Sequence, residues 1–134
     1  MEDAFVKTPR YVLRDGAYPT FPSVLQISPD VHRHVIYGFS DKPEYDVFLS
    51  GSSLALTPYP LVKGFLTTQI ELDSGSLRLV VLDAASSAER CLYAATFQSV
   101  LESFHLGSEC VAVSHRLVLE ESSSHYRIEA LSSL

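Results

Sequence analysis

The sequence predicts an α+β, β-rich fold, in which a curved antiparallel sheet or small barrel of about six to eight strands packs against one long amphipathic helix. Stretches that alternate between apolar and polar residues predict the sheet, because successive side chains of a strand point to opposite faces. A stretch with apolar residues at helical spacing predicts the helix. The 134 residues have the length of one domain, so we expect residues 1–134 to share a single core.

Prolines give the two parts of the chain a different texture, since all seven lie at or before position 60. Residues 1–60 are therefore expected to be short strands between loops, and residues 61–131 a regular hairpin–helix–hairpin unit. Within the first part, alternation predicts a strand over 45–50. Residues 24–27 and 31–39 fit a hairpin, although the serine–proline pair between them also fits a helix start. The β-branched and aromatic residues of 31–39 favour the strand.

The second part opens with a predicted hairpin. Residues 62–72 alternate between an apolar and a polar face, and residues 77–82 alternate again after a serine–glycine turn. A two-residue loop at this turn would set Glu71 opposite Arg78 as a cross-strand pair of opposite charge. The alternation of apolar residues and the Glu71–Arg78 pair thus agree on one register.

A long helix is predicted over about residues 87–105. Ser86 and Glu89 have the spacing of a capping box, in which each side chain serves backbone N–H groups of the first helical turn. Apolar residues then recur every three or four positions from Tyr93 to Phe104. Gly107 suits the left-handed residue that ends a helix.

The chain is predicted to end in a second hairpin with a serine turn. In its register, Leu119 faces Tyr126 and Arg116 faces Glu129. The loop could be longer than two residues, because serine is a weaker turn former than glycine.

Composition limits the partners and the compartment. The formal charge is −6 and the ten basic residues are spread singly, so no nucleic-acid partner is expected. No apolar run approaches the ~20 residues that span a bilayer, so no membrane is expected. The acidic Glu2 and Asp3 stand where a signal peptide would be basic. We therefore expect a cytoplasmic, reducing compartment, with Cys91 and Cys110 as free thiols.

His32 and His34 are the candidate metal ligands. On a strand both rings would project from one face, and an ion would need a further ligand from a nearby carboxylate. Solvated surface histidines explain the pair more simply. No glycine-rich phosphate loop or nucleophile elbow is present, so no cofactor is expected and a catalytic role is the less favoured one. His115 is expected at the edge of the core rather than as a general base.

Aromatic residues gather in the proline-rich first part, among them Tyr37, Phe39, Tyr45 and Tyr59. Core filling is the favoured interpretation, and a ligand cavity or partner surface is the alternative. Phe65 is the lone aromatic on the polar face of 62–72, which also carries Lys63. We expect this face to be covered by the N-terminal segment or by a partner.

Three functional hypotheses follow. The first is a non-catalytic protein–protein interaction module or small subunit of a complex, self-association as a homodimer included, with partner-binding residues Phe65, Lys63, Tyr37, Phe39, Tyr45 and Tyr59. The second is a barrel-like binder of a small apolar ligand, its cavity lined by the tyrosines and phenylalanines. The third is a metal-dependent enzyme that uses His32 and His34.

Overall fold

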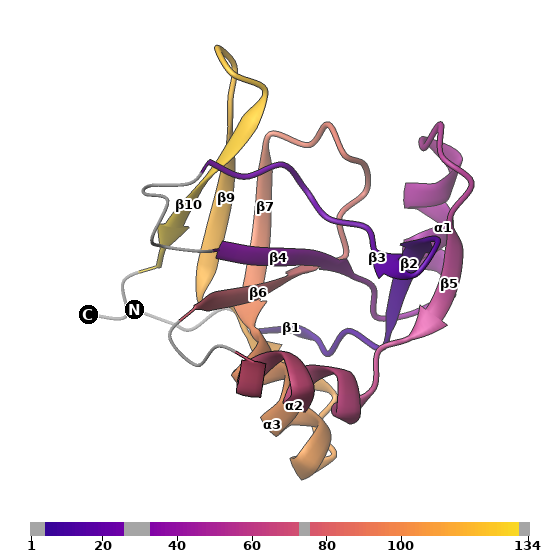
Figure 1. The fold of residues 1–134 in the computed structure, drawn as a ribbon, viewed down its shortest axis with the longest axis vertical. Coiled ribbons are helices and arrows are strands. Elements are labelled where there is room, and N and C mark those ends of the chain that lie inside the picture. Colours follow the sequence, from indigo (N-terminus) through magenta and orange to yellow (C-terminus); the bar gives the residue numbers. More distant parts are fainter. Residues whose placement is uncertain (1–4, 26–32, 73–75, 132–134) are drawn as a thin grey trace.

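The computed structural model describes residues 5–25, 33–72 and 76–131, and confirms an α+β, β-rich fold built on a curved sheet (Figure 1). In chain order, its elements are β1 (Phe5–Lys7), β2 (Tyr11–Asp15), β3 (Tyr18–Pro19), β4 (Arg33–Gly38), α1 (Lys42–Ser50), β5 (Thr57–Pro60), α2 (Lys63–Leu72), β6 (Leu77–Leu82), β7 (Cys91–Thr96), α3 (Phe97–Leu106), β8 (Cys110–Ala112), β9 (His115–Glu120) and β10 (His125–Ala130). None of the helices in these ranges is long and apolar enough to cross a membrane.

The central sheet has the strand order β10-β9-β7-β6-β4. Its neighbours are antiparallel except for β4 and β6, which run parallel. Smaller sheets join β1 to β8, and β3, β2 and β5 to one another. Strand β6 is buried along nearly its whole length, because elements cover both faces of the sheet at this point.

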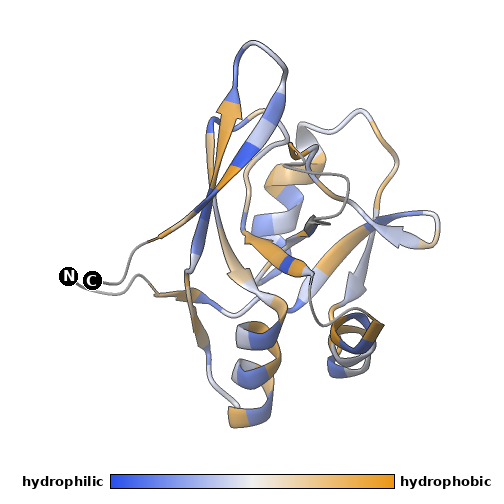
Figure 2. Ribbon diagram, turned by 60° about the vertical axis from the view of Figure 1, so that its left-hand side comes forward, coloured by the Kyte–Doolittle hydropathy of each residue, from blue (hydrophilic) through white to orange (hydrophobic). Residues whose placement is uncertain are grey.

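Two apolar cores lie on the opposite faces of the sheet. Tyr37 and Leu79 point into one core, which Phe48 of α1 also enters. Val80 points into the other core, beneath α2 and α3, where it meets Leu66 and two residues of α3. Helices α2 and α3 lie side by side, away from α1 (Figure 1). The central strands are mostly apolar, whereas the helices carry both kinds of residue (Figure 2).

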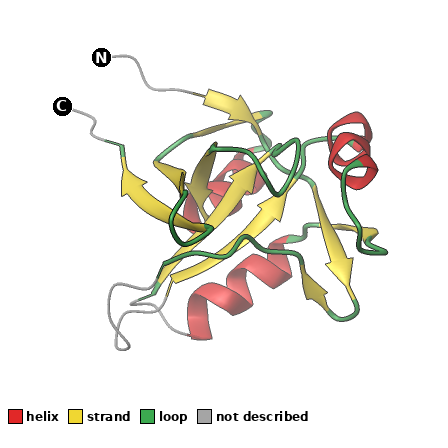
Figure 3. Ribbon diagram, turned by 90° about the horizontal axis from the view of Figure 1, so that it is seen from above, coloured by secondary structure: helices red, strands yellow, loops and turns green. Residues whose placement is uncertain are grey.

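A short segment, residues 20–25, connects the two edges of the curved sheet, and we call it the strap. At one edge, the backbone N–H of Tyr37 in β4 donates to the carbonyl of Thr20 at 3.0 Å. At the other edge, Tyr126 of β10 exchanges backbone hydrogen bonds of 2.8 and 2.9 Å with Ser23 and Leu25. The strap runs across the open side of the sheet (Figures 1 and 3). The sheet is thus neither fully open nor a continuous barrel, but a curl that the strap spans.

Two of the predicted strands are helices. Residues 45–50 belong to α1, which Asp41 caps by accepting from the N–H of Lys42 at 2.8 Å, with proline in the first turn. Residues 63–72 of the predicted strand form α2, with Leu66 fully buried and Phe65 and Ile70 partly buried on the same side. Alternation also places apolar residues four apart, which is the helical spacing, and the tertiary packing of α2 on α3 selected the helix.

The prediction of a hairpin between 62–72 and 77–82 is therefore wrong, although 77–82 is a strand. Strand β6 pairs with β4 and β7, and Arg78 lies opposite His34 instead of Glu71. The strand interpretation of 31–39 is confirmed over β4. The hairpin between 24–27 and 31–39 turns on residues outside the described part, but Val24 bridges to Tyr126 of β10.

The prediction of a long helix over 87–105 is correct only for its second half. Residues 91–96 are strand β7, and the helix starts at Phe97, where Thr96 caps it by accepting from the N–H of Ser99 at 3.0 Å. Gly107 ends it with φ 65°, as expected. The capping-box residues do serve backbone N–H groups: Ser86 accepts from Ala88 and Glu89 from Ala85. They form a turn ahead of β7. Strand β7 is the middle strand of the central sheet, so its residues pair with neighbouring strands and do not form a helix.

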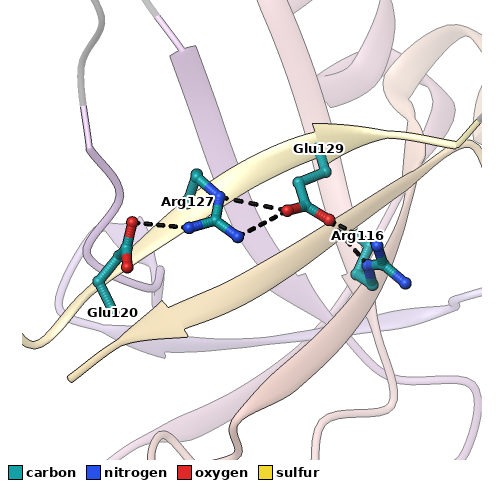
Figure 4. A network of polar contacts seen from close by, with 4 residues as sticks. All are labelled: Arg116, Glu120, Arg127 and Glu129. Atoms are coloured by element: carbon teal, nitrogen blue, oxygen red, sulfur yellow. Dashed lines mark hydrogen bonds and ion pairs between the residues drawn. The ribbon is translucent and has the colours of Figure 1, made fainter.

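The final hairpin is confirmed in register, with Leu119 opposite Tyr126 and Arg116 opposite Glu129. Its loop is a four-residue turn. Ion pairs line its outer face: Glu129 binds Arg116 at 2.6 Å and Arg127 at 2.7 Å, and Arg127 binds Glu120 at 2.8 Å (Figure 4). The hydrogen bonds from Arg127 and Arg116 lower the pKa of Glu129 below its usual value.

Candidate functional site

A groove of about 460 Å³ lies between the strap, the edge strand β4 and helix α2, and we call it the strap groove. It is lined mainly by apolar side chains, among them Phe21, Val35, Ile36, Phe65, Leu72 and Phe97. Phe65 of α2 packs against Phe97 of α3, with ring centroids 6.2 Å apart. The floor of the groove is therefore continuous with the core beneath α2 and α3.

Three large side chains on the rim of this groove face solvent. Tyr18 is 71% exposed, Phe21 64% and Leu72 69%. Single exposed apolar residues are ordinary on a protein surface, but a cluster around one hollow is typical of a binding surface. All three line the strap groove, with Tyr18 and Phe21 from one short stretch of the chain and Leu72 from the end of α2.

Arg78 is the charged residue inside the strap groove. It lies on β6, is only 5% exposed, and its Nη1 donates to the side-chain oxygen of Gln69 at a long 3.4 Å. Its Nε atom is buried with no hydrogen-bond partner, and no carboxylate of residues 5–25, 33–72 or 76–131 forms an ion pair with it. Burying a cation without a counter-charge costs free energy, so Arg78 is not expected to stabilise the fold by itself.

The structure separates the two residues predicted on the polar face of 62–72. Phe65 lines the strap groove, whereas Lys63 lines another, shallower hollow of about 700 Å³ beside Val62 and Phe104. On a strand these two side chains would share a face, but on a helix positions two apart are about 200° apart. Phe65 is covered in part by the chain itself, through Phe97.

The four aromatic candidates of the first part lie outside the strap groove. Tyr37 and Phe39 are buried in the core against Phe48, at centroid distances of 4.8 and 5.4 Å. Burial raises the pKa of the Tyr37 hydroxyl well above its usual value. Tyr45 packs edge-on against a tyrosine of β2, and Tyr59 carries a guanidinium 4.2 Å above its ring. Tyr37 and Phe39 thus fill the core and Tyr45 packs against it, whereas Tyr59 is 41% exposed.

Only one of the two predicted metal ligands can be placed. His34 is exposed on β4, lines the strap groove and lies beside Arg78 in the strand register. His32 lies outside the described residues, so the pair stays a prediction. The ranges that the structure describes contain no cluster of three His, Cys, Asp or Glu side chains suited to a metal ion.

Serine–histidine contacts at His125 and His115 have simple structural roles. Ser23 of the strap bonds Nδ1 of His125 on β10, which fastens the strap to that edge of the sheet. Ser114 bonds Nδ1 of its neighbour His115, which is half-buried as expected. A serine nucleophile needs a histidine that a third group orients. Among the described residues no carboxylate bonds His125.

Asp83 forms a polar contact that the sequence did not reveal. It follows β6 with φ 51°, and its carboxylate accepts from the N–H and the hydroxyl of Ser40 at 2.7 and 2.8 Å. Burial raises its pKa, and the charge of Glu44 raises it further against the opposing Ser40 hydrogen bonds. The contact ties the end of β6 to the end of β4, which fits a structural clamp.

Comparisons of the chain with protein-family models, with curated proteins and with solved structures found no match. Function is therefore inferred from the strap groove itself. Its apolar walls, its exposed rim and the buried guanidinium of Arg78 suit the binding of an apolar group next to an anion.

Proposed function

We propose that the protein is a non-catalytic protein–protein interaction module that binds a segment of a partner protein in the strap groove. The observation that carries this proposal is the exposed rim formed by Tyr18, Phe21 and Leu72. A partner segment that covers these side chains removes apolar surface from water, which is the main driving force of association.

A small apolar ligand is the second candidate. The groove volume of about 460 Å³ falls in the range of small-molecule sites, about 300–1,000 Å³. A ligand held within the hollow, however, would leave the three rim side chains in water. A protein segment covers both the hollow and its rim, and for this reason we favour the partner protein.

The proposal is tested by native mass spectrometry of the protein purified gently from its own host. We expect a mass above that of the monomer for the wild type, by the mass of a second protein or of a second copy. The double variant Phe21→Ser/Leu72→Ser should run as a monomer, because it replaces two rim side chains with polar ones.

Val47→Ser is the matched control. Val47 is 54% exposed on α1, outside the strap groove, and this variant should keep the partner. A complex that survives in the rim variant, or an increment of a few hundred daltons in place of a protein, would count against the proposal. The second of these results would favour the small ligand.

A further inference from the structure

We infer that the bound segment carries a carboxylate, from an acidic side chain or its own C-terminus, and that Arg78 binds it inside the strap groove. This inference rests on the proposed function and names the chemistry of the partner. It predicts that the carboxylate is flanked by an apolar side chain, because Phe65 and Phe97 line the same groove.

The state of Arg78 carries the inference. Arg78 is more deeply buried than any other charged side chain that the structure describes, and Nε has no partner. A guanidinium presents five N–H donors in a planar fork that matches a carboxylate. Its hydrogen bond to Gln69, at 3.4 Å, is too long to satisfy such a group. A carboxylate would supply both the missing acceptor and the missing charge.

The surroundings of Arg78 explain why a charge at this position is selective. Its strand neighbours Leu79 and Val80 are fully buried, and Phe97 of α3 is 1% exposed. A charge–charge hydrogen bond in such surroundings is strong, but leaving one partner unpaired is costly. A neutral apolar segment would fill the groove and leave Arg78 without a counter-charge, so Arg78 discriminates against it.

The position on the sheet places Arg78 where a partner can reach it. Arg78 pairs in register with His34 of the edge strand β4, and both residues line the groove. The other arginines of described ion pairs lie at the surface: Arg90, Arg116 and Arg127 each bind a glutamate of the same chain. Arg78 differs in being buried beside a hollow that is open at its rim.

Two libraries of random octapeptides test the inference, one displayed with free C-termini and one with the C-termini joined to the display protein. Each is selected on immobilised wild-type protein and counter-selected on the Phe21→Ser/Leu72→Ser variant. We expect enriched peptides to combine Phe, Leu or Ile with a neighbouring Asp, Glu or free C-terminus. The library in which they appear distinguishes an acidic side chain from a C-terminal carboxylate.

The best binder is then compared with its neutral form, in which the carboxylate is replaced by the amide. We expect the wild type to lose about ten- to a hundredfold in affinity, as for a hydrogen bond to a charged group. Arg78→Met should bind both forms about equally, and Arg78→Lys should recover part of the preference because it keeps the charge but loses the fork. The amide comparison needs no change in the protein, so it remains decisive if a variant fails to fold.

The outcomes separate the inference from the proposed function. Enriched peptides that depend on the rim but are neutral, or bind equally as amides, would overturn the role of Arg78 and leave the interaction module standing. Selection that enriches no rim-dependent peptide from either library would overturn both.

Discussion

Arginine side chains have opposite environments on the outer face of the final hairpin and in the strap groove. On the hairpin, Arg116 and Arg127 are partly exposed to water and still have glutamates of the same chain as partners. In the groove, Arg78 is buried away from water, and no carboxylate of the described residues forms an ion pair with it. Exposed ion pairs contribute little to stability, whereas an unpaired buried charge opposes it. The groove therefore holds a side chain that folding alone does not favour, which supports the proposal that the groove binds a partner.

The largest expected effect concerns the floor of the groove. Phe97→Ala should lower the free energy of unfolding by about 3 to 5 kcal/mol, because it removes a fully buried aromatic ring from the core under α2 and α3. Leu119→Ala on the half-buried hairpin should cost less. Urea unfolding of both variants measures the difference. An equal loss would mean that the groove floor is no better packed than the hairpin.

The second effect has the opposite sign. Arg78→Met should raise the free energy of unfolding by about 1 to 3 kcal/mol, since it replaces a buried charge with an apolar side chain of similar length. Arg116→Met on the hairpin breaks an exposed ion pair and should change stability little, in the unfavourable direction. Thermal and urea unfolding in the absence of any peptide measure both. A destabilised Arg78→Met would show that the charge already has a favourable partner in the free protein.

The third effect is a pH dependence that differs between two carboxyl groups. Glu129 has a lowered pKa in the folded state, so its contribution is complete above the unfolded pKa and is lost as pH falls through the folded pKa. Asp83 has a raised pKa, so between its unfolded and folded pKa values stability rises as pH falls. Unfolding of Glu129→Gln and Asp83→Asn from pH 3 to 8 should remove these two slopes separately. Unchanged slopes would contradict the assignments.

The smallest effect on stability is expected at the rim. Phe21→Ser should change the free energy of unfolding by less than about 0.5 kcal/mol, because the ring is mostly in water in the free protein. The same change should abolish binding of rim-dependent peptides, measured by fluorescence anisotropy of a labelled peptide. A large loss of stability would show that Phe21 holds the strap in place and is not reserved for a partner.

Local pairing explains why the hairpin was predictable and the groove was not. Arg116 and Glu129 face each other across a short turn, so charge and apolar alternation set the register together. Arg78 was expected opposite Glu71 by the same reasoning, but residues 63–72 are helical and β6 pairs with β4. A parallel pair is joined through a long crossover, and nothing in the local pattern reports it.

For some of the structure that was not predicted, the sequence does contain a signal. Asp41, Lys42 and Pro43 are a helix start, with a capping carboxylate and a proline in the first turn, ahead of residues whose alternation resembled a strand. Phe65 was singled out as an aromatic on the polar face of a predicted strand, and the structure places it on α2 in the groove, but its partner Phe97 and the buried Arg78 belong to distant elements. The candidate residue was thus visible in the sequence, while the groove around it depended on tertiary packing.

The strap also bears on the solubility of the chain. An edge strand offers unpaired backbone groups to any other strand it meets, and proteins cover or interrupt such edges to avoid aggregation. Here one proline-containing segment hydrogen-bonds to β4 at Thr20 and to β10 at Ser23 and Leu25. Changes that release the strap would uncover both edges at once. Their expected first consequence is association of sheets edge to edge.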